Sequence, residues 1–134
     1  MLKDIPQPLV EDVAIAVVQD ENEKGELIWS SYLINMKSEP IEGVLVSTKG
    51  YGTYQGTDVK TSMLRHFLDV VPAKEFTLIE PIIEDLFGLN NEFWLSFYCR
   101  GVMYDKKDIF LPESIQEDFF INIPLLNKKG VMIR

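Results

Sequence analysis

Short apolar segments, each bounded by glycine, proline or polar turn residues, recur along this chain of 134 residues. The clearest segment covers residues 92–100, where two sets of side chains alternate: Phe93, Leu95, Phe97 and Cys99 in one set, and Trp94, Ser96, Tyr98 and Arg100 in the other. Strict alternation is typical of a strand that buries one face. Turn signals about every 8–12 residues leave no room for long helices, so the pattern favours a fold built from short strands.

The other segments extend this pattern. Residues 12–19 carry apolar side chains on both faces, which indicates a central strand, and a polar loop at 20–25 connects it to a partner strand at 27–36. Further strands are expected at 43–48 and 75–83. Roughly seven to nine strands of this kind predict an all-β antiparallel sandwich with an immunoglobulin-like architecture. A chain of this length has enough mass for one core, so residues 1–134 are expected to form one domain.

Two segments leave an alternative fold open. The apolar residues of 59–71 fit a helical stripe as well as a strand, and residues 113–120 fit a short helix. If both are helical, the chain is an α+β protein with one antiparallel sheet. Two other segments are interpreted as irregular: residues 49–58 as a loop rich in glycine and tyrosine, and residues 105–108 as a polar turn.

The charge of the chain excludes several classes of partner. Thirteen basic and 21 acidic side chains leave a net charge of −8, which excludes DNA and disfavours RNA as a partner. The longest apolar run, residues 13–18, is far shorter than the roughly 20 residues that span a bilayer, so no membrane span is expected. Residues 1–8 do not resemble a secretory signal, and a single thiol favours the cytoplasm.

The chain has few of the residues that usually carry out catalysis or bind metals. The chain has one histidine, His66, and one cysteine, Cys99, which lies in phase with the apolar side of its strand and is expected to be buried. One residue of each type does not make a zinc site. Residues 20–31 imitate an EF-hand loop, but Lys24 and Ser31 stand where oxygen ligands are needed. No metal, cofactor or catalytic residue is therefore predicted.

Four residues are candidate contact residues. Residues 50–56 lack the lysine of a phosphate-binding loop, but Tyr51 and Tyr54 are rigid amphipathic groups of the kind enriched in binding surfaces. Arg65 and His66 are added because they are a potential carboxylate-binding residue and a potential hydrogen-bonding residue. The alternative interpretation is that the tyrosines cover the end of the sandwich and that His66 is a hydrogen-bonded structural residue.

Four segments carry a resemblance to a known family: Leu64-Arg-His-Phe, Ile79-Glu-Pro-Ile, residues 105–114 and Leu126-Asn-Lys-Lys-Gly-Val. The chain resembles, over nearly its whole length, a family of short uncharacterised bacterial proteins, some of them labelled phenylalanyl-tRNA synthetase α subunit. The label implies an RNA-related role. Arg65 is followed by His-Phe-Leu and Arg100 by Gly-Val-Met, contexts that differ from the arginine motifs of class II synthetases, so no catalytic residue is carried over.

Three functions follow as hypotheses. The first is a non-catalytic β-sandwich module for binding a protein partner or for self-assembly. The second is a small enzyme or ligand-binding protein that uses His66; it predicts that His66 lies in a concave apolar pocket with a carboxylate within hydrogen-bond reach. The third is an accessory protein related to RNA or a tRNA synthetase, and it predicts salt-dependent RNA binding.

Overall fold

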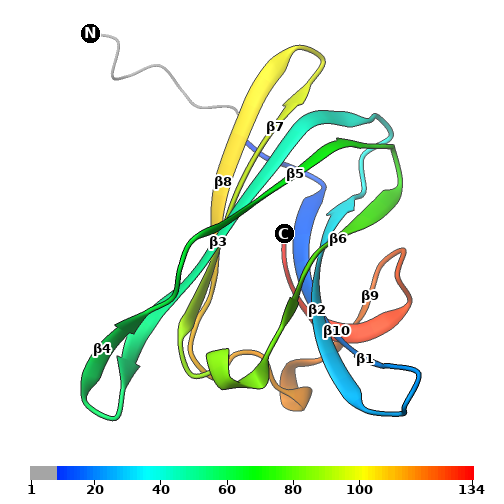
Figure 1. Cartoon of the computed structure of the whole chain (residues 1–134). Helices are drawn as coiled ribbons and strands as arrows, with labels where there is room; N and C mark the ends of the chain where they lie inside the picture. Colours follow the sequence, from blue (N-terminus) through cyan, green and yellow to red (C-terminus); the bar gives the residue numbers. More distant parts are fainter. Residues whose placement is uncertain (1–8) are drawn as a thin grey trace, which may run out of the picture.

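The computed structural model describes residues 9–134, and the expectation about a signal at residues 1–8 lies outside this range. The described chain consists almost entirely of strands connected by short turns (Figure 1). Two short 3₁₀ turns, η2 (Glu84–Leu86) and η3 (Glu117–Phe119), lie between strands. The strands are β1 (Val13–Glu21), β2 (Leu27–Asn35), β3 (Ile41–Tyr54), β4 (Thr57–Lys60), β5 (Leu64–Val71), β6 (Glu75–Ile82), β7 (Asn90–Cys99), β8 (Val102–Phe110), β9 (Ile121–Ile123) and β10 (Lys128–Ile133).

The strands form two antiparallel sheets that face each other (Figure 1). Sheet A has the order β6-β2-β1-β10-β9. Sheet B has the order β4-β3-β7-β8, and β5 also pairs with β3. Strands β1, β2 and β6 thus take the places of A, B and E in an immunoglobulin-like sandwich, and β5, β3, β7 and β8 take those of C′, C, F and G. The predicted all-β sandwich of immunoglobulin-like architecture is confirmed.

The core lies between the sheets and follows the alternation in the sequence. In β7, Phe93, Leu95, Phe97 and Cys99 are buried, while Trp94 and Tyr98 on the other side of the strand are exposed. In β1, Val13, Ile15 and Val17 point into the same core. The predicted burial of Cys99 and the predicted central position of β1 are both confirmed.

The outer side of sheet A is covered at β1 by the chain's own C-terminal hairpin. Ala14, Ala16 and Val18 of β1 are fully buried there, in a second cluster with Ile123 and Leu126 from the β9–β10 region. The hairpin is also tied to β1 by an ion pair between Lys128 and Asp20. This second cluster explains why the sequence of β1 is apolar on both faces.

The α+β alternative is wrong for both segments that suggested it. Residues 59–71 contain the end of β4 and all of β5, which pairs with β3 from Ile41↔Val71 to Thr48↔Leu64. Residues 113–120 contain only the 3₁₀ turn η3. The apolar residues of 59–71 have a helix-like spacing because β5 lies at a sheet edge and carries apolar residues on both of its sides. Burial on one side only, which would produce the two-residue alternation of a strand, is therefore absent. In the described residues, no helix is long and apolar enough to cross a membrane.

The prediction of a loop at residues 49–58 is also wrong. Strand β3 runs through it to Tyr54 and pairs with β4 in the register Tyr51↔Lys60 to Tyr54↔Thr57. Gln55 and Gly56 form the two-residue turn, both with positive φ (52° and 79°), as a type I′ hairpin turn requires. The hairpin projects from the body of the sandwich (Figure 1). The glycines indicated a loop, but a strand also tolerates glycine where another segment approaches it closely. This is the case at Gly50, where a Cβ would lie 3.2 Å from Thr61 Cγ2.

The polar turn predicted at residues 105–108 is the middle of β8. This strand is an edge of sheet B, and it pairs continuously with β7 from Cys99↔Val102 to Asn91↔Phe110. Lys106 and Asp108 share the inward side, where Lys106 Nζ lies 2.9 Å from Asp108 Oδ2. Inward-pointing charges on an edge strand hinder pairing with a second molecule, which is the physical reason that a strand here carries polar residues.

Candidate functional site

The four predicted contact residues do not form one site. Ser47 of β3 lies opposite Arg65 of β5, and the next pair in the ladder is Val46 opposite His66. Consecutive residues of a strand point to opposite faces, so Arg65 lies on the outer face of sheet B and His66 lies on the side of the core. Tyr51 is half-buried in β3, and Tyr54 is exposed at the tip of the β3–β4 hairpin.

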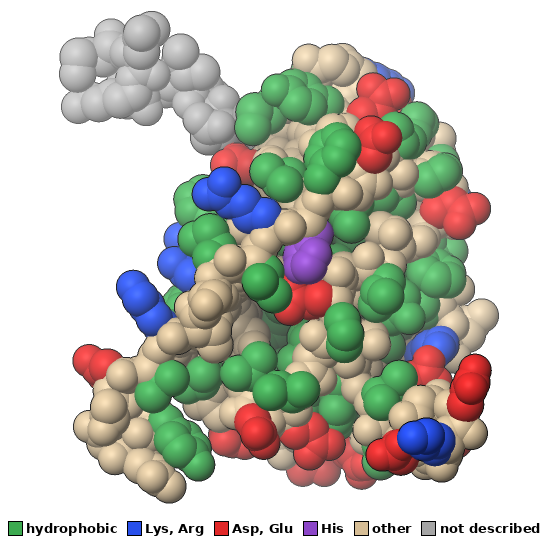
Figure 2. All heavy atoms as spheres, in the orientation of Figure 1, with side chains coloured by type: hydrophobic (Ala, Val, Ile, Leu, Met, Phe, Trp, Pro, Cys, Tyr) green, Lys and Arg blue, Asp and Glu red, His purple; other side chains and the backbone are tan. Residues whose placement is uncertain are grey.

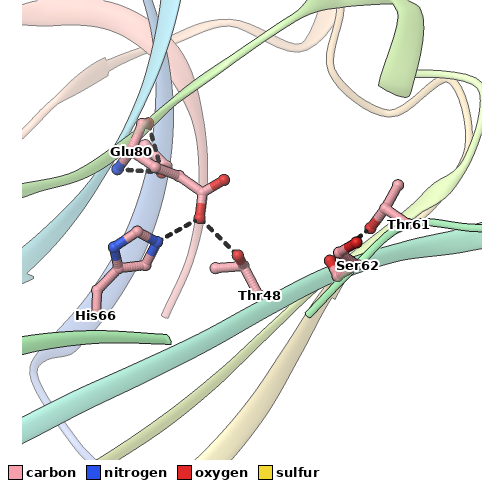
Figure 3. Close-up of polar contacts among 6 residues, drawn as sticks. Thr48, Thr61, Ser62, His66 and Glu80 are labelled. Atoms are coloured by element: carbon pink, nitrogen blue, oxygen red, sulfur yellow. Dashed lines mark hydrogen bonds and ion pairs between the residues drawn. The ribbon is translucent and has the colours of Figure 1, made fainter. Parts of the chain in front are cut away.

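His66 takes part in a hydrogen-bonded network that joins the two sheets at their open edge (Figure 3). Its Nε2 atom lies 2.8 Å from Oε1 of Glu80, which belongs to β6 of sheet A. The same oxygen accepts a hydrogen bond of 2.5 Å from the Thr48 hydroxyl, on β3 of sheet B. The carboxylate of Glu80 therefore receives hydrogen bonds from two strands of the opposite sheet.

The backbone of Glu80 is held as firmly as its side chain. Ser31 Oγ of β2 donates to the Glu80 carbonyl oxygen at 2.9 Å, and the Glu80 amide donates back to Ser31 Oγ at 3.3 Å. These bonds lie where the β2–β6 register shifts between Ser31 and Tyr32. A bulge in an edge strand re-aims a side chain, and here it accompanies a carboxylate turned toward the other sheet.

A cavity of about 210 Å³ lies beside this network, between the β4–β5 connection, β6 and β7. Figure 2 shows the chain's one histidine next to a hollow in the surface. Hydrogen-bonding side chains line part of the cavity: Thr48, Thr61, Ser62, Glu80 and Asn91. Apolar side chains line the rest: Leu64, Ile82, Leu86 and Phe93. The carboxylate expected near His66 is thus present, and Glu80 contributes it to the cavity wall, whereas His66 itself does not line this cavity.

This arrangement can hold a ligand more readily than it can run a nucleophilic reaction. Within residues 9–134, His66 makes its hydrogen bond to Glu80 and none to a hydroxyl or thiol. Cys99, the one thiol, is buried on β7 in the core. Nucleophilic catalysis needs a base within hydrogen-bond reach of the nucleophile. In the same part of the chain, no three potential metal-ligating side chains gather.

The outer face of sheet B forms a second candidate surface. We use the name sheet B outer face for the exposed apolar residues Leu45, Phe67, Trp94 and Tyr98 with the cations Arg65 and Lys107. Phe67 is 67% exposed and Trp94 is 47% exposed. Across the strands, Arg65 pairs with Ser47, Ser47 with Trp94 and Trp94 with Lys107, so one row carries a cation at each end. The Lys107 ammonium lies over the Trp94 ring, 4.8 Å from its centroid.

Tyr51 sits beside this face with a partner of its own. Its hydroxyl donates to Glu92 Oε1 at 3.4 Å, and Lys49 Nζ lies 3.7 Å from the other Glu92 oxygen. Desolvation first, then the charge and hydrogen bond of Glu92, raise the pKa of Tyr51 above its usual value of 10.0. Tyr51 therefore covers a carboxylate of its own sheet, and Tyr54 is the more accessible of the two tyrosines.

Sequence reasoning missed Glu80 and most of the sheet B outer face. A single glutamate in a β-segment has no local feature that marks it. The outer face did have a signal: Trp94 and Tyr98 stand on the side of β7 that should be polar, opposite Phe93 and Phe97. Aromatic residues on the solvent side of a strand indicate a contact surface.

Comparisons with models of protein families, with curated proteins and with solved structures found no match to this chain. The geometry of the two candidate surfaces is therefore the basis for assigning a function.

Proposed function

We propose that this protein is a non-catalytic β-sandwich module that binds a partner protein through the sheet B outer face. One observation carries the proposal: on sheet A the hairpin β9–β10 buries the outer apolar residues of β1 and leaves Phe76 and Leu78 exposed on the edge strand β6, whereas on sheet B the exposed Leu45, Phe67, Trp94 and Tyr98 extend over three neighbouring strands. Burial of exposed aromatic residues is a main source of binding free energy at protein interfaces.

The charges on this face indicate the chemistry of the partner. Arg65 and Lys107 stand at the two ends of the row through Trp94, while the acidic residues of the face, Asp105 and Glu42, lie opposite Ser96 and Tyr98, away from this row. An acidic segment with an apolar side chain fits this row, because its carboxylates would meet the cations while the apolar group covers the indole ring. A second copy of the chain is the less favourable occupant, since its own outer face would bring the same two cations, Arg65 and Lys107, to the interface.

Affinity capture with paired variants tests the proposal. The double variant Phe67→Ser/Trp94→Ser removes two exposed apolar groups from the sheet B outer face. The control Leu78→Ser/Ile83→Ser removes two exposed apolar groups elsewhere. The partner should bind the wild type and the control with similar affinity. It should bind the face variant at least roughly 30-fold more weakly, which corresponds to about 2 kcal/mol for a tryptophan hot spot.

Three outcomes would contradict the proposal. The first is equal retention by both double variants, and the second is capture of nothing by a protein that sediments as a monomer. The third is retention of RNA instead of protein, with an affinity that falls steeply with salt, which would favour the RNA-related hypothesis. If the face variant disperses a dimer of the wild type, the occupant is a second copy.

Ligand binding near His66 is the second candidate function, and one observation favours it. The predicted carboxylate lies 2.8 Å from the imidazole and forms part of a cavity wall. A fragment screen that follows the backbone amide signals of Thr48, Leu64 and Glu80 by NMR tests this candidate. Binding of no fragment at these amides would refute it.

A further inference from the structure

The two oxygens of the Glu80 carboxylate have different surroundings. Oε1 accepts the hydrogen bonds from His66 and Thr48, and within residues 9–134 no hydrogen bond reaches Oε2. Figure 3 shows Oε2 turned away from these two donors, on the side where Thr61 and Ser62 lie. A carboxylate with one oxygen held in place presents the other as a pre-oriented acceptor.

The other charges near the cavity are already paired. Glu92, the second carboxylate in its wall, has Lys49 3.7 Å from Oε2 and Tyr51 3.4 Å from Oε1. Glu80 is therefore the carboxylate with an oxygen available to a ligand. Its side chain is 18% exposed, so a cation bound there would be largely withdrawn from solvent.

The size and lining of the cavity limit what can accompany the cation. A cavity of about 150 Å³ in another protein binds benzene, and this one measures about 210 Å³. Leu64, Ile82, Leu86 and Phe93 supply an apolar wall on which a hydrocarbon group of that size can pack.

We propose that this cavity binds a small organic amine, with its ammonium group on Glu80 Oε2 and its apolar body against the core-side wall. The inference rests on the ligand-binding candidate function and names its ligand class. It does not depend on the sheet B outer face, because Glu80 and the outer face lie on opposite sides of sheet B.

Titration with benzylamine, followed by ¹H–¹⁵N NMR at about pH 7, where alkyl amines are protonated, tests the proposal. Benzyl alcohol has the same body without the charge, and phenylacetate carries the opposite charge. Benzylamine should shift the amide signals of Thr48, Leu64 and Glu80. It should bind at least about tenfold more tightly than benzyl alcohol, because a hydrogen bond between charged groups is lost in the alcohol.

Three variants locate the contact. Glu80→Gln should weaken benzylamine binding at least about tenfold, whereas Glu75→Gln, the same charge change at an exposed position of β6, should leave it within about twofold. Ser62→Lys places a competing ammonium at an exposed position of the cavity wall without altering Glu80, and it should also weaken binding. This variant gives a result even if Glu80→Gln does not fold.

The possible failures are distinguishable. If benzyl alcohol or phenylacetate shifts the cavity signals as strongly as benzylamine, or if Glu80→Gln and Glu75→Gln have equal effects, the amine proposal is overturned while ligand binding in the cavity stands. If none of the three compounds shifts these signals, both the amine proposal and the ligand-binding candidate fail.

Discussion

Replacing Gly130 by alanine tests why the C-terminal hairpin can cover sheet A. A Cβ at this position would lie 2.2 Å from the carbonyl oxygen of Val17 and 2.9 Å from Val18 Cα. Both are backbone atoms, so no side-chain rotation relieves the clash. Ordinary contact begins near 3.4 Å, so β10 must move away from β1 by about 3.4 − 2.2 = 1.2 Å.

The cost of this movement can be worked out from the β1–β10 ladder. A separation of about 1.2 Å stretches a hydrogen bond of about 2.9 Å beyond the 3.5 Å limit. The ladder runs from Ile15↔Ile133 to Val18↔Gly130. Loss of two bonds at about 1 kcal/mol each, with overpacking at the low end of its range of about 1–3 kcal/mol, lowers the free energy of unfolding by roughly 3 kcal/mol. With about 0.28 kcal/mol/K of unfolding entropy for this length, Tm falls by roughly 11 °C.

Calorimetry and urea unfolding measure this change, and Gly88→Ala is the matched control. Gly88 has no positive φ, and its nearest atom to a new Cβ would be Glu113 Oε1 at 3.6 Å, the end of a flexible side chain. The control should change the free energy of unfolding by less than about 1 kcal/mol. A Tm for Gly130→Ala within about 2 °C of the wild type would refute the close approach of β10 to β1.

Three further predictions concern ionisable groups. Asp108→Asn leaves the charged Lys106, which is 14% exposed, without its partner, and urea unfolding should show a loss of about 3–5 kcal/mol in the free energy of unfolding. Replacing both residues by apolar ones should lower it less than the single change, and the reverse order would contradict this prediction. Glu92→Gln should lower the pKa of Tyr51 but leave it above 10.0, because desolvation is the larger cause of the shift. Tyrosinate absorbance measures this pKa, with Tyr51→Phe as the reference that identifies the Tyr51 signal. An unchanged pKa would exclude Glu92 as a contributor. The lysine hydrogen bond from β10 lowers the pKa of Asp20 from 3.8, so the stability it contributes is present above 3.8 and lost as the pH falls through the folded-state pKa. Asp20→Asn should therefore lower stability by less than about 1 kcal/mol at about pH 6, since both partners are over a third exposed, and the loss should shrink as the pH falls below 3.8; a loss that does not change with pH would contradict it.

Much of the fold could be predicted because burial alternates with the period of a strand. The side chains of β7 have their predicted inside and outside, and β1 is buried on both faces as its sequence indicates. The predictions failed where this period is absent. In β5 both sides carry apolar residues, in β8 charged residues point inward, and in β3 glycines stand inside a strand. Each exception lies at a sheet edge or in the projecting hairpin, where neighbouring strands constrain the side chains least.

The candidate site could be predicted only in part. His66 stands out because it is the one histidine, and the sequence predicts a carboxylate partner for it, but no local feature identifies Glu80. Arg65 and His66 are adjacent in the sequence and point to opposite faces of sheet B, so they cannot share a ligand. Trp94 was visible as an aromatic residue on the outward side of β7, yet its row with Arg65 and Lys107 comes from three different strands.

The sequence by itself determined local properties of its clearest segments: that β1, β2 and β7 are strands, that β1 is apolar on both faces, and which side of β7 is buried. Only the tertiary structure decided which strands face each other and in which register. Glu80 and His66 meet because β5 and β6 lie at the edges of different sheets, with a bulge at Ile79 of β6 beside the carboxylate that faces the other sheet. The alternation of apolar and polar residues indicates only which side of a single strand is buried. A site between two sheets depends on pairings between residues far apart in the chain, which no local pattern contains.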